Sequence, residues 1–262
     1  MTRTKTRILV FLLSIVCISC EKHEWQGFLN IEKWSVDTQR LPERELPRIK
    51  NLRSLKRYLN DDELRQVQII YLAGVPFVES LDGIELFPVL KDLGIEQTRI
   101  ESLKGIQNSR LLESVETVDC ALGDYSAIAK SSSIEWLRIR ELDKPLINFS
   151  QNESIKYLSV SEGSFVTLED LLPAKFYPKS LRLLAVANVG LVEIDSFLKT
   201  NTQIQDLYVG HNAIEEIDLS LVKAPLTELT LNDNPFIERY KIKDWKKVIN
   251  GTTVFFYTED SD

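Results

Sequence analysis

The sequence is poor in the residues that build disulfide scaffolds and histidine-based active sites. Its 262 residues include 3 cysteines and 2 histidines, which excludes a disulfide-rich scaffold and leaves little material for a zinc site or an imidazole base. The 10 glycines and 9 prolines are few, and 44% of the chain is hydrophobic, so the chain is not collagen-like, low-complexity or disordered. Cations are also scarce, with 32 Lys and Arg against 39 Asp and Glu. A formal charge of −7 lacks the long-range attraction to phosphate that non-specific binding requires, so nucleic acid is not an expected partner.

The apolar run near the N-terminus is too short to cross a bilayer. Ile8–Ile18 has 11 residues and is interrupted by Ser14, whereas a spanning helix needs about 20 apolar residues. Three cations precede the run, at Arg3, Lys5 and Arg7. A positively charged start followed by a short apolar run is typical of a signal peptide.

A cysteine motif follows this run directly. The segment Cys17-Ile18-Ser19-Cys20 resembles the lipobox of bacterial lipoproteins, with a small residue before Cys20, although Cys17 stands where Leu is usual. The resemblance implies cleavage before Cys20 and acylation of its sulfur, by palmitate or related chains, which would anchor the protein to a membrane of the bacterial cell envelope. Cleavage would lower the formal charge to −10 and leave Cys120 as the one remaining thiol. A plain secretory signal or an uncleaved anchor is the alternative interpretation.

An apolar pattern recurs through the rest of the chain. A unit begins at an apolar residue and continues with apolar or Asn residues at positions +3, +5, +8, +10 and +13. The unit that begins at Ile204 shows it most clearly, with Leu207, Val209, Asn212, Ile214 and Ile217. Eight units follow one another at spacings of 21 to 26 residues, beginning at Val67, Leu90, Leu112, Ile134, Ile155, Leu181, Ile204 and Leu226.

This pattern resembles the leucine-rich repeat family, whose units of about 20–29 residues carry an L-x-x-L-x-L-x-x-N/C-x-L core. The resemblance covers residues 67–240 and implies an α/β solenoid with a curved parallel sheet on its concave face. Apolar residues at +3 and +5 have the period of a strand with one buried face, and such strands bury that face by stacking. Only Asn212 and Asn234 supply the +8 amide that normally bonds backbone groups at the turn. Cys120 is a permitted substitute there, and we expect it to be a buried, unreactive thiol.

The two ends of the array are predicted to be caps. The expected order is a signal peptide at 1–19, a lipidated tether and N-terminal segment at 20–50, a helical cap at 51–66, repeats at 67–240 and a short C-terminal cap at 241–262. Leucines at helical spacing within Asn51–Gln66 predict an amphipathic helix over the first repeat. At the other end we expect a short helix over Asp244–Ile249, a turn at Asn250-Gly251 and a strand over Val254–Tyr257. The 26-residue unit that begins at Ile155 is expected to bulge on its convex side.

Positions +2, +4 and +6 alternate with the inward residues and should project from the concave face. The early units place acids there, including Asp92, Glu96 and Glu116. Because Trp136 and Tyr157 share the +2 position of adjacent units, we expect them about 5 Å apart. Exposed Trp, Tyr and Arg are enriched in binding hot spots. The residues predicted to bind a partner are therefore Trp136, Arg138, Arg140, Tyr157 and Tyr208. The alternative is that these rings are ordinary half-buried strand aromatics, and the bulge around Phe176 and Tyr177 is then the next candidate.

No sequence motif points to catalysis. The GxSxG, GxxxxGK[ST] and HExxH patterns are absent from the sequence, and His211 and the acids around Asp92 are interpreted as solvated side chains. We expect no catalytic residue, no metal and no cofactor. The sequence thus predicts a membrane-anchored leucine-rich repeat lipoprotein, not an enzyme, that binds another protein through its concave face. Two alternatives remain: an enzyme or enzyme subunit acting on envelope polysaccharide, and an uncleaved cytoplasmic interaction scaffold.

Overall fold

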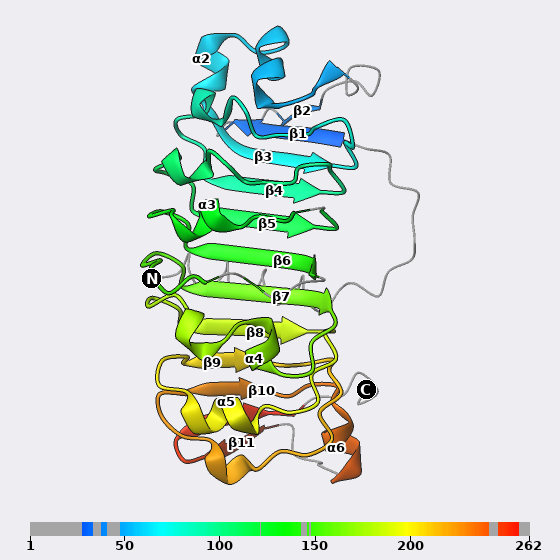
Figure 1. Cartoon of the computed structure of the whole chain (residues 1–262), viewed down its shortest axis with the longest axis vertical. Helices are drawn as coiled ribbons and strands as arrows, with labels where there is room; N and C mark the ends of the chain where they lie inside the picture. The colour runs from blue at the N-terminus through cyan, green and yellow to red at the C-terminus, as the bar shows by residue number, and fades with distance from the viewer. Residues whose placement is uncertain are drawn as a thin grey trace.

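A computed structural model describes residues 28–33, 38–40, 48–120, 122–142, 146, 148–240 and 246–256. Each of the eight repeat units contributes one strand. These are β3 (Val67–Ala73), β4 (Asp92–Glu96), β5 (Ser114–Val118), β6 (Trp136–Leu142), β7 (Tyr157–Gly163), β8 (Leu183–Ala187), β9 (Asp206–Tyr208) and β10 (Glu228–Thr230). They lie in chain order, and each strand is parallel to the next (Figure 1). The predicted parallel sheet is confirmed.

Burial in β6 follows the predicted alternation, whereas all five residues of β8 are buried. In β6, Leu137 and Ile139 at +3 and +5 are 0% and 1% exposed, whereas Trp136, Arg138 and Arg140 are half-buried on the other face. Leu184, Leu207 and Leu229 occupy the same inward position in β8, β9 and β10 and are also buried. The inward side chains of all units therefore form one continuous hydrophobic core.

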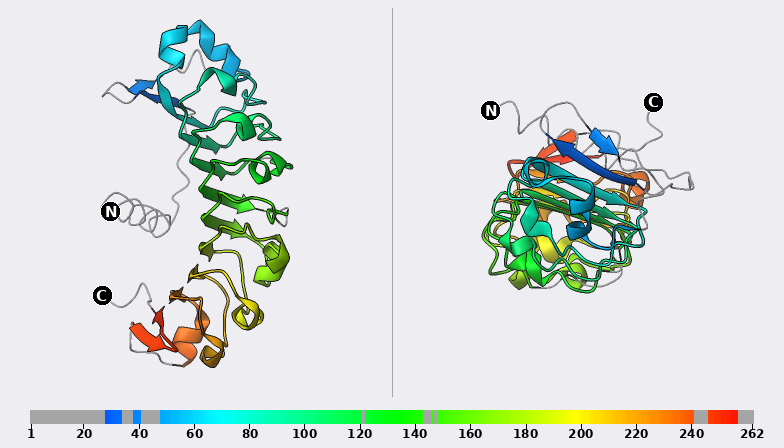
Figure 2. Two further views of the ribbon diagram at one scale, coloured as in Figure 1. Left: turned by 90° about the vertical axis from the view of Figure 1, so that its left-hand side faces the viewer. Right: turned by 90° about the horizontal axis from the view of Figure 1, so that it is seen from above.

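Short helices and turns cover the other side of this core. They are η3 (Ile84–Leu86), η4 (Ile106–Asn108), α3 (Ser126–Ala129), α4 (Leu168–Leu171), η5 (Ala174–Phe176), α5 (Asp195–Thr200), η6 (Leu219–Leu221) and α6 (Pro235–Arg239). Figure 2 shows the strands along the inner side of an arc, with most of these elements on its outer side. The short helical turns occupy more room than the closely spaced strands, which bends the stack toward the sheet. The fold is an α/β leucine-rich repeat solenoid.

Every unit of the array has one residue in the left-handed backbone region at or shortly after the end of its strand. The +7 residue of each unit has φ between 45° and 59°: Gly74, Gln97, Asp119, Glu141, Glu162, Asn188, His211 and Asp233. Positive φ is uncommon for residues other than glycine and is favoured by Asn and Asp. The N–H of Gln97 donates to the carbonyl of Val118 in the next unit, at 3.0 Å. The left-handed residue thus ends the strand and redirects the chain while it stays bonded to its neighbour.

The two asparagines at +8 make the backbone contacts that the family pattern implies. The Asn212 amide nitrogen donates to the carbonyls of Val186 and Val209, at 2.9 and 3.1 Å, and its oxygen accepts from the N–H of Val189. Asn234 repeats this arrangement one unit later and is 2% exposed. Each amide therefore ties its own turn to the turn of the preceding unit.

Cys120 occupies the same +8 position and takes part of the same role. Its thiol is half-buried and donates to the carbonyls of Val118 and Ile95, at 3.1 and 3.3 Å. Burial raises the pKa of the Cys120 thiol above its usual value, with the Asp119 charge acting in the same direction. A neutral thiol is a poor nucleophile. The interpretation of Cys120 as a structural residue agrees with these contacts.

A second set of buried polar contacts lies before the strands, and the sequence pattern did not predict it. Asn152, three residues before the start of its unit, is 1% exposed. Its amide nitrogen donates to the carbonyls of Ile128 and Ser131, at 3.0 and 2.9 Å, and its oxygen accepts from the N–H groups of Ser154 and Ile155. The units are therefore joined by side-chain hydrogen bonds at both ends of their strands.

The N-terminal cap differs from the single helix expected over 51–66. It contains two short turns, η2 (Leu52–Arg57) and α2 (Asp61–Leu64). The break falls at Asn60, whose backbone is extended and whose side chain caps α2 in a reciprocal capping box with Glu63. Asn60 therefore favours a new helix start over continuation of the first. The leucines of both turns still belong to the common core.

Two further strands extend the sheet before the cap. Strand β1 (Phe28–Lys33) pairs antiparallel with β3, and β2 (Thr38–Arg40) pairs antiparallel with β1. Part of the segment expected as a tether therefore belongs to the sheet. The signal-peptide residues and Cys20 lie outside the described residues. Within the described ranges, no helix is long and apolar enough to cross a membrane.

The helix expected over Asp244–Ile249 is wrong. Residues Lys246–Ile249 form strand β11, which pairs antiparallel with β12 (Thr252–Phe255), and Val248 is 66% exposed. The reason is the intervening turn: Asn250 and Gly251 have φ of 50° and 85°, and consecutive residues with positive φ are typical of a tight hairpin. The predicted turn is present, and a last strand follows it, but this strand begins at Thr252, two residues earlier than expected, because its pairing with Ile249 starts directly after the turn. Strand β12 adds to the sheet parallel to β10.

Truncating an inward leucine should destabilise the fold strongly. We expect Leu207→Ala to lower the free energy of unfolding by about 2–5 kcal/mol, because Leu207 is fully buried and its removal leaves a cavity. Leu111→Ala is the matched control, since Leu111 is 46% exposed and should change stability by less than about 0.5 kcal/mol. Urea denaturation measures both. A loss below about 1 kcal/mol for Leu207→Ala would contradict the inward assignment.

The left-handed turn makes a separate prediction at Gln97. We expect Gln97→Val to be less stable than Gln97→Asn by about 1–2 kcal/mol, because a β-branched residue tolerates the φ of 49° poorly and Asn tolerates it well. The same two substitutions at Gln68, in strand β3, serve as the control, and there Val should be the more stable residue. Thermal or urea unfolding compares the four variants. If the Val variant were the more stable one at both positions, the left-handed conformation of Gln97 would be contradicted.

Candidate binding surface on the concave face

The centre of the concave face carries a stacked pair of aromatic rings. Trp136 and Tyr157 are register partners in β6 and β7, and their ring centroids are 3.7 Å apart with an angle of 15° between the planes. Both side chains are half-buried. The predicted proximity of the two rings is confirmed, and the distance is shorter than the spacing of their backbones because the rings stack face to face. The pair places two stacked aromatic rings at the middle of the array.

Two arginines next to this pair form ion pairs across the sheet. Arg138 Nη1 lies 3.0 Å from Glu116 Oε1 on β5, and Arg140 Nη2 lies 3.2 Å from Glu162 Oε1 on β7. The arginine side chains are only 16% and 18% exposed, so solvent screens these pairs less than ordinary surface pairs. Each guanidinium is held in a defined place. The sequence placed Glu116 on this face but gave no indication that it would pair with Arg138.

Tyrosines toward the two ends of the face bond to neighbouring acids. The Tyr208 hydroxyl donates to Glu228 Oε1 at 2.6 Å, and the Tyr71 hydroxyl donates to Glu96 Oε2 at 2.5 Å. Burial, followed by these carboxylates, raises the pKa of both phenols, so both remain neutral donors. The Tyr71 ring lies over Gly94, where a Cβ atom would come within 2.0 Å of it. Gly94 therefore allows the ring to lie flat across the next strand.

The left-handed turns of three central units place acids side by side along one edge of this face. Asp119, Glu141 and Glu162 hold the +7 positions after β5, β6 and β7. Burial, then the hydrogen bond and charge of Asp119, then the charge of Glu162 raise the pKa of Glu141 to about 7, while Arg140 acts in the opposite direction. The Asp119–Glu141 pair therefore holds a proton in mildly acidic solution.

The structure brings together four of the five residues predicted to bind a partner. Trp136, Arg138, Arg140 and Tyr157 lie on the adjacent strands β6 and β7. Tyr208 lies on β9, beyond β8, and is separated from Tyr157 by two strand spacings of about 4.8 Å each. The five residues thus share one face but form a central cluster and a separate tyrosine.

Other polar side chains on this face do not assemble into a reactive site. His211 Nε2 lies 3.5 Å from Asp233 Oδ2, the acid at the equivalent turn of the next unit. Across the part of the chain that the structure describes, no group of three or more His, Cys, Asp or Glu residues is placed to hold a metal ion. The central cluster of aromatic and paired arginine side chains is therefore the feature that suits a binding surface best.

Comparisons with known proteins add to this description. No family model matches the sequence, and no curated protein is significantly similar to it. Similar solved structures include an internalin C2 from Listeria monocytogenes, with 19% identity and a TM-score of 0.49, covering 68% of this chain and 76% of that chain. The functional domain of InlJ from the same species has 17% identity and a TM-score of 0.44, and the match covers 66% of this chain and 41% of that chain. An internalin InlF, also from that species, has 16% identity and a TM-score of 0.42, and the match covers 67% of this chain and 64% of that chain. The repeats and the sheet of this chain define its class, a leucine-rich repeat solenoid.

The raised pKa of Glu141 makes stability depend on pH. The Glu141 carboxyl titrates near 4.5 in an unfolded chain and near 7 in the folded protein, so the folded state binds more protons between these values. The stability contribution of Glu141 is therefore fully present below pH 4.5 and is lost as the pH rises through about 7. Relative to Glu141→Gln, the wild-type protein should lose stability between about pH 5 and about pH 8.

Urea unfolding at these two pH values measures the difference. Glu101→Gln is the control, because Glu101 is an exposed acid outside the concave face and its substitution should leave the pH profile of the wild-type protein unchanged. Parallel profiles for wild-type protein and Glu141→Gln would show that Glu141 titrates as an ordinary surface acid.

Proposed function

We propose that this protein binds another protein through the concave face of its repeat array, without catalysis, while a lipid on Cys20 holds it at a membrane of the bacterial cell envelope. The binding role rests on the surface of β6 and β7. The anchor rests on the sequence Cys17-Ile18-Ser19-Cys20 and on the apolar run that precedes it.

The stacked Trp136–Tyr157 pair is the observation that carries the binding role. Two large rings at the centre of a concave face can lose contact with water over a wide area, and aromatic side chains lose little rotamer entropy on binding. Each ring also fixes the position of the other, so the surface is ordered before a partner arrives. Preorganisation of this kind reduces the entropic cost of association.

The neighbouring arginines add directional hydrogen bonding to this apolar centre. A guanidinium carries five N–H donors, and the ion pair of Arg140 with Glu162 engages one of its nitrogens. The remaining donors of Arg140 lie on the same face as the rings, four residues further along β6, and can bond carbonyl or carboxylate oxygens of a partner. This combination of anchored arginine and aromatic rings is characteristic of binding hot spots.

Photo-crosslinking tests which face binds. A photo-reactive residue at Ser161, on β7 beside the pair, should crosslink to a partner in intact envelopes, whereas the same residue at Lys199, on the convex α5, should not. The crosslinked protein can then be identified and purified for affinity measurements. Crosslinks to the same protein from Lys199 alone would place the binding surface on the other side of the solenoid.

Truncation of the aromatic pair should weaken binding more than it weakens folding. With that partner, Trp136→Ala or Tyr157→Ala should raise the Kd by about 30-fold or more, equivalent to about 2 kcal/mol. Tyr240→Ala is the control, since Tyr240 is an exposed ring at the C-cap of α6, away from the pair. Affinity and Tm are measured on the same variants. A lowered Tm with unchanged affinity would mean that the rings serve the fold of the strands.

The lipid anchor has an independent test. In cells supplied with a clickable palmitate analogue, the wild-type protein should carry the label and the Cys20→Ala variant should not. The Cys20→Ala variant should also accumulate in its uncleaved form and be absent from the acylated protein of the membrane fraction. Cys120→Ala is the matched control and should be labelled normally. Absence of label on the wild-type protein would contradict the lipoprotein assignment and leave a secretory signal or an uncleaved anchor, and label on Cys20→Ala would place the acyl chain on another residue.

A further inference from the structure

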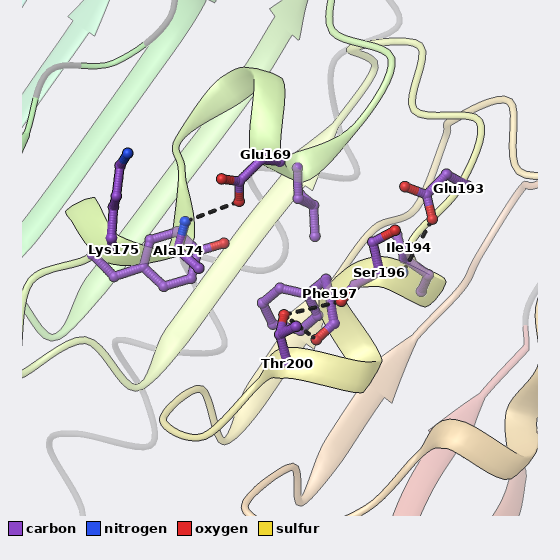
Figure 3. A pocket seen from close by; sticks show the side chains of 10 residues that line it. Glu169, Ala174, Lys175, Glu193, Ile194, Ser196, Phe197 and Thr200 are labelled. Carbon is purple, nitrogen blue, oxygen red and sulfur yellow. Dashed lines mark hydrogen bonds between the residues drawn. The ribbon is translucent and has the colours of Figure 1, made fainter.

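The longest repeat unit borders a partly open cavity on the convex side of the solenoid. Its volume is about 440 Å³, and it lies between the α4–η5 segment and α5 of the next unit (Figure 3). This unit spans 26 residues and contains the additional turn η5 after α4. Pockets that bind small ligands have volumes of about 300–1,000 Å³. The predicted bulge therefore contains a space large enough for a small molecule.

The interior of this cavity is apolar and rigidly placed. Leu168, Ile194 and Phe197 line it and are buried in the common core. Tyr177 also lines it, and its ring centroid lies 6.5 Å from that of Phe197, with a tilt of 50°. Two tilted aromatic rings and two aliphatic side chains form a surface that suits the flat body of an aromatic ligand.

Two carboxylates at the rim give the cavity a negative side. Glu169 Oε2 accepts from the N–H of Ala174 at 3.0 Å, and Glu193 Oε2 accepts from the N–H of Ser196 at 3.2 Å. These bonds fix each carboxylate through one oxygen. Neither acid has a cationic partner within the described ranges, and the second oxygen of each accepts no hydrogen bond there.

The one cation of the lining does not neutralise these acids. The Lys175 ammonium lies 5.2 Å from the centroid of the Phe176 ring. Figure 3 shows Glu169 extending from α4 and Glu193 from the segment before α5, while Lys175 extends away from both. The Tyr177 hydroxyl makes no hydrogen bond to the described residues, and burial followed by the Glu169 charge raises its pKa, so it stays neutral. The rim therefore offers two carboxylate oxygens and one phenol.

We propose that this cavity binds a small organic cation that has an aromatic body and one ammonium group. The aromatic body would replace water over Leu168, Ile194, Tyr177 and Phe197. The ammonium would bond the second oxygen of one of the two acids, Glu169 or Glu193, while the charge of the other acid also attracts it. This site lies on the convex side and is independent of the proposed protein-binding surface on β6 and β7.

Phenethylamine is a suitable probe, titrated into the full chain and followed by ligand-observed NMR or calorimetry. We expect saturable binding with a Kd on the order of 1 mM, as befits a ligand of this size. Phenylpropionate, which keeps the ring and reverses the charge, should bind at least about tenfold more weakly, and ethylamine, which keeps the charge without the ring, should do the same.

Charge-removing variants locate the site. Glu169→Gln and Glu193→Gln keep an oxygen for the backbone N–H and should each weaken phenethylamine binding by about fivefold or more. Glu63→Gln is the matched control, because Glu63 also accepts a backbone N–H at a helix start but lies far away on α2. Trp136→Ala should leave phenethylamine binding unchanged, which separates this test from that of the proposed function. No saturation up to about 20 mM, equal binding of phenylpropionate or ethylamine, or unchanged affinity in both glutamine variants would overturn the proposal.

Discussion

Each strand of this protein buries its inner face against the strands of neighbouring units, because no unit contains a partner for its own. Leu207 shows this dependence: it is fully buried and lies in register with Leu184 on one side and Leu229 on the other. This mutual burial holds the strands at one spacing of about 4.8 Å. The outward side chains inherit that spacing, so Trp136 and Tyr157 can stack only because Leu137 and Leu158 are aligned beneath them. The arrangement of the candidate binding surface is thus a consequence of how the core packs.

Much of the fold could be predicted because the spacing of the leucines shows which side chains are buried. Two apolar residues separated by one polar residue define a half-buried strand, and eight such strands define the array and the face that Trp136 occupies. The left-handed turns could not be predicted in the same way, since Glu141 and Glu162 have no preference for positive φ and adopt it because the stack requires it. The C-terminal error had a similar cause. Asn250-Gly251 indicates a turn but does not say whether a helix or a strand precedes it, and pairing with β12 decides for the strand.

The candidate site was predictable to the level of the backbone. Shared positions in adjacent units placed Trp136 beside Tyr157. Which side chain pairs with which depends on rotamers and neighbouring contacts, so the ion pairs and the tyrosine–glutamate bonds became visible only in the structure. The convex cavity lies further still from the sequence. The 26-residue length of the unit that begins at Ile155 predicted a bulge on the convex side. The cavity itself depends on how η5 and α5 pack together, which the sequence does not show.

The side-chain ties between units are unevenly distributed along the array. Asn212 and Asn234 join the last units through several amide bonds each, while Val75, Thr98 and Cys120 hold the same position near the amino end. In a repeat protein each unit contacts only its neighbours, so the units with the weaker interfaces unfold first. We therefore expect partial unfolding to begin at the amino end and to proceed toward the units joined by Asn212 and Asn234. The Trp136–Tyr157 pair lies ahead of those units. A partner bound there would act as a clamp, since its binding free energy would also hold the weaker links closed.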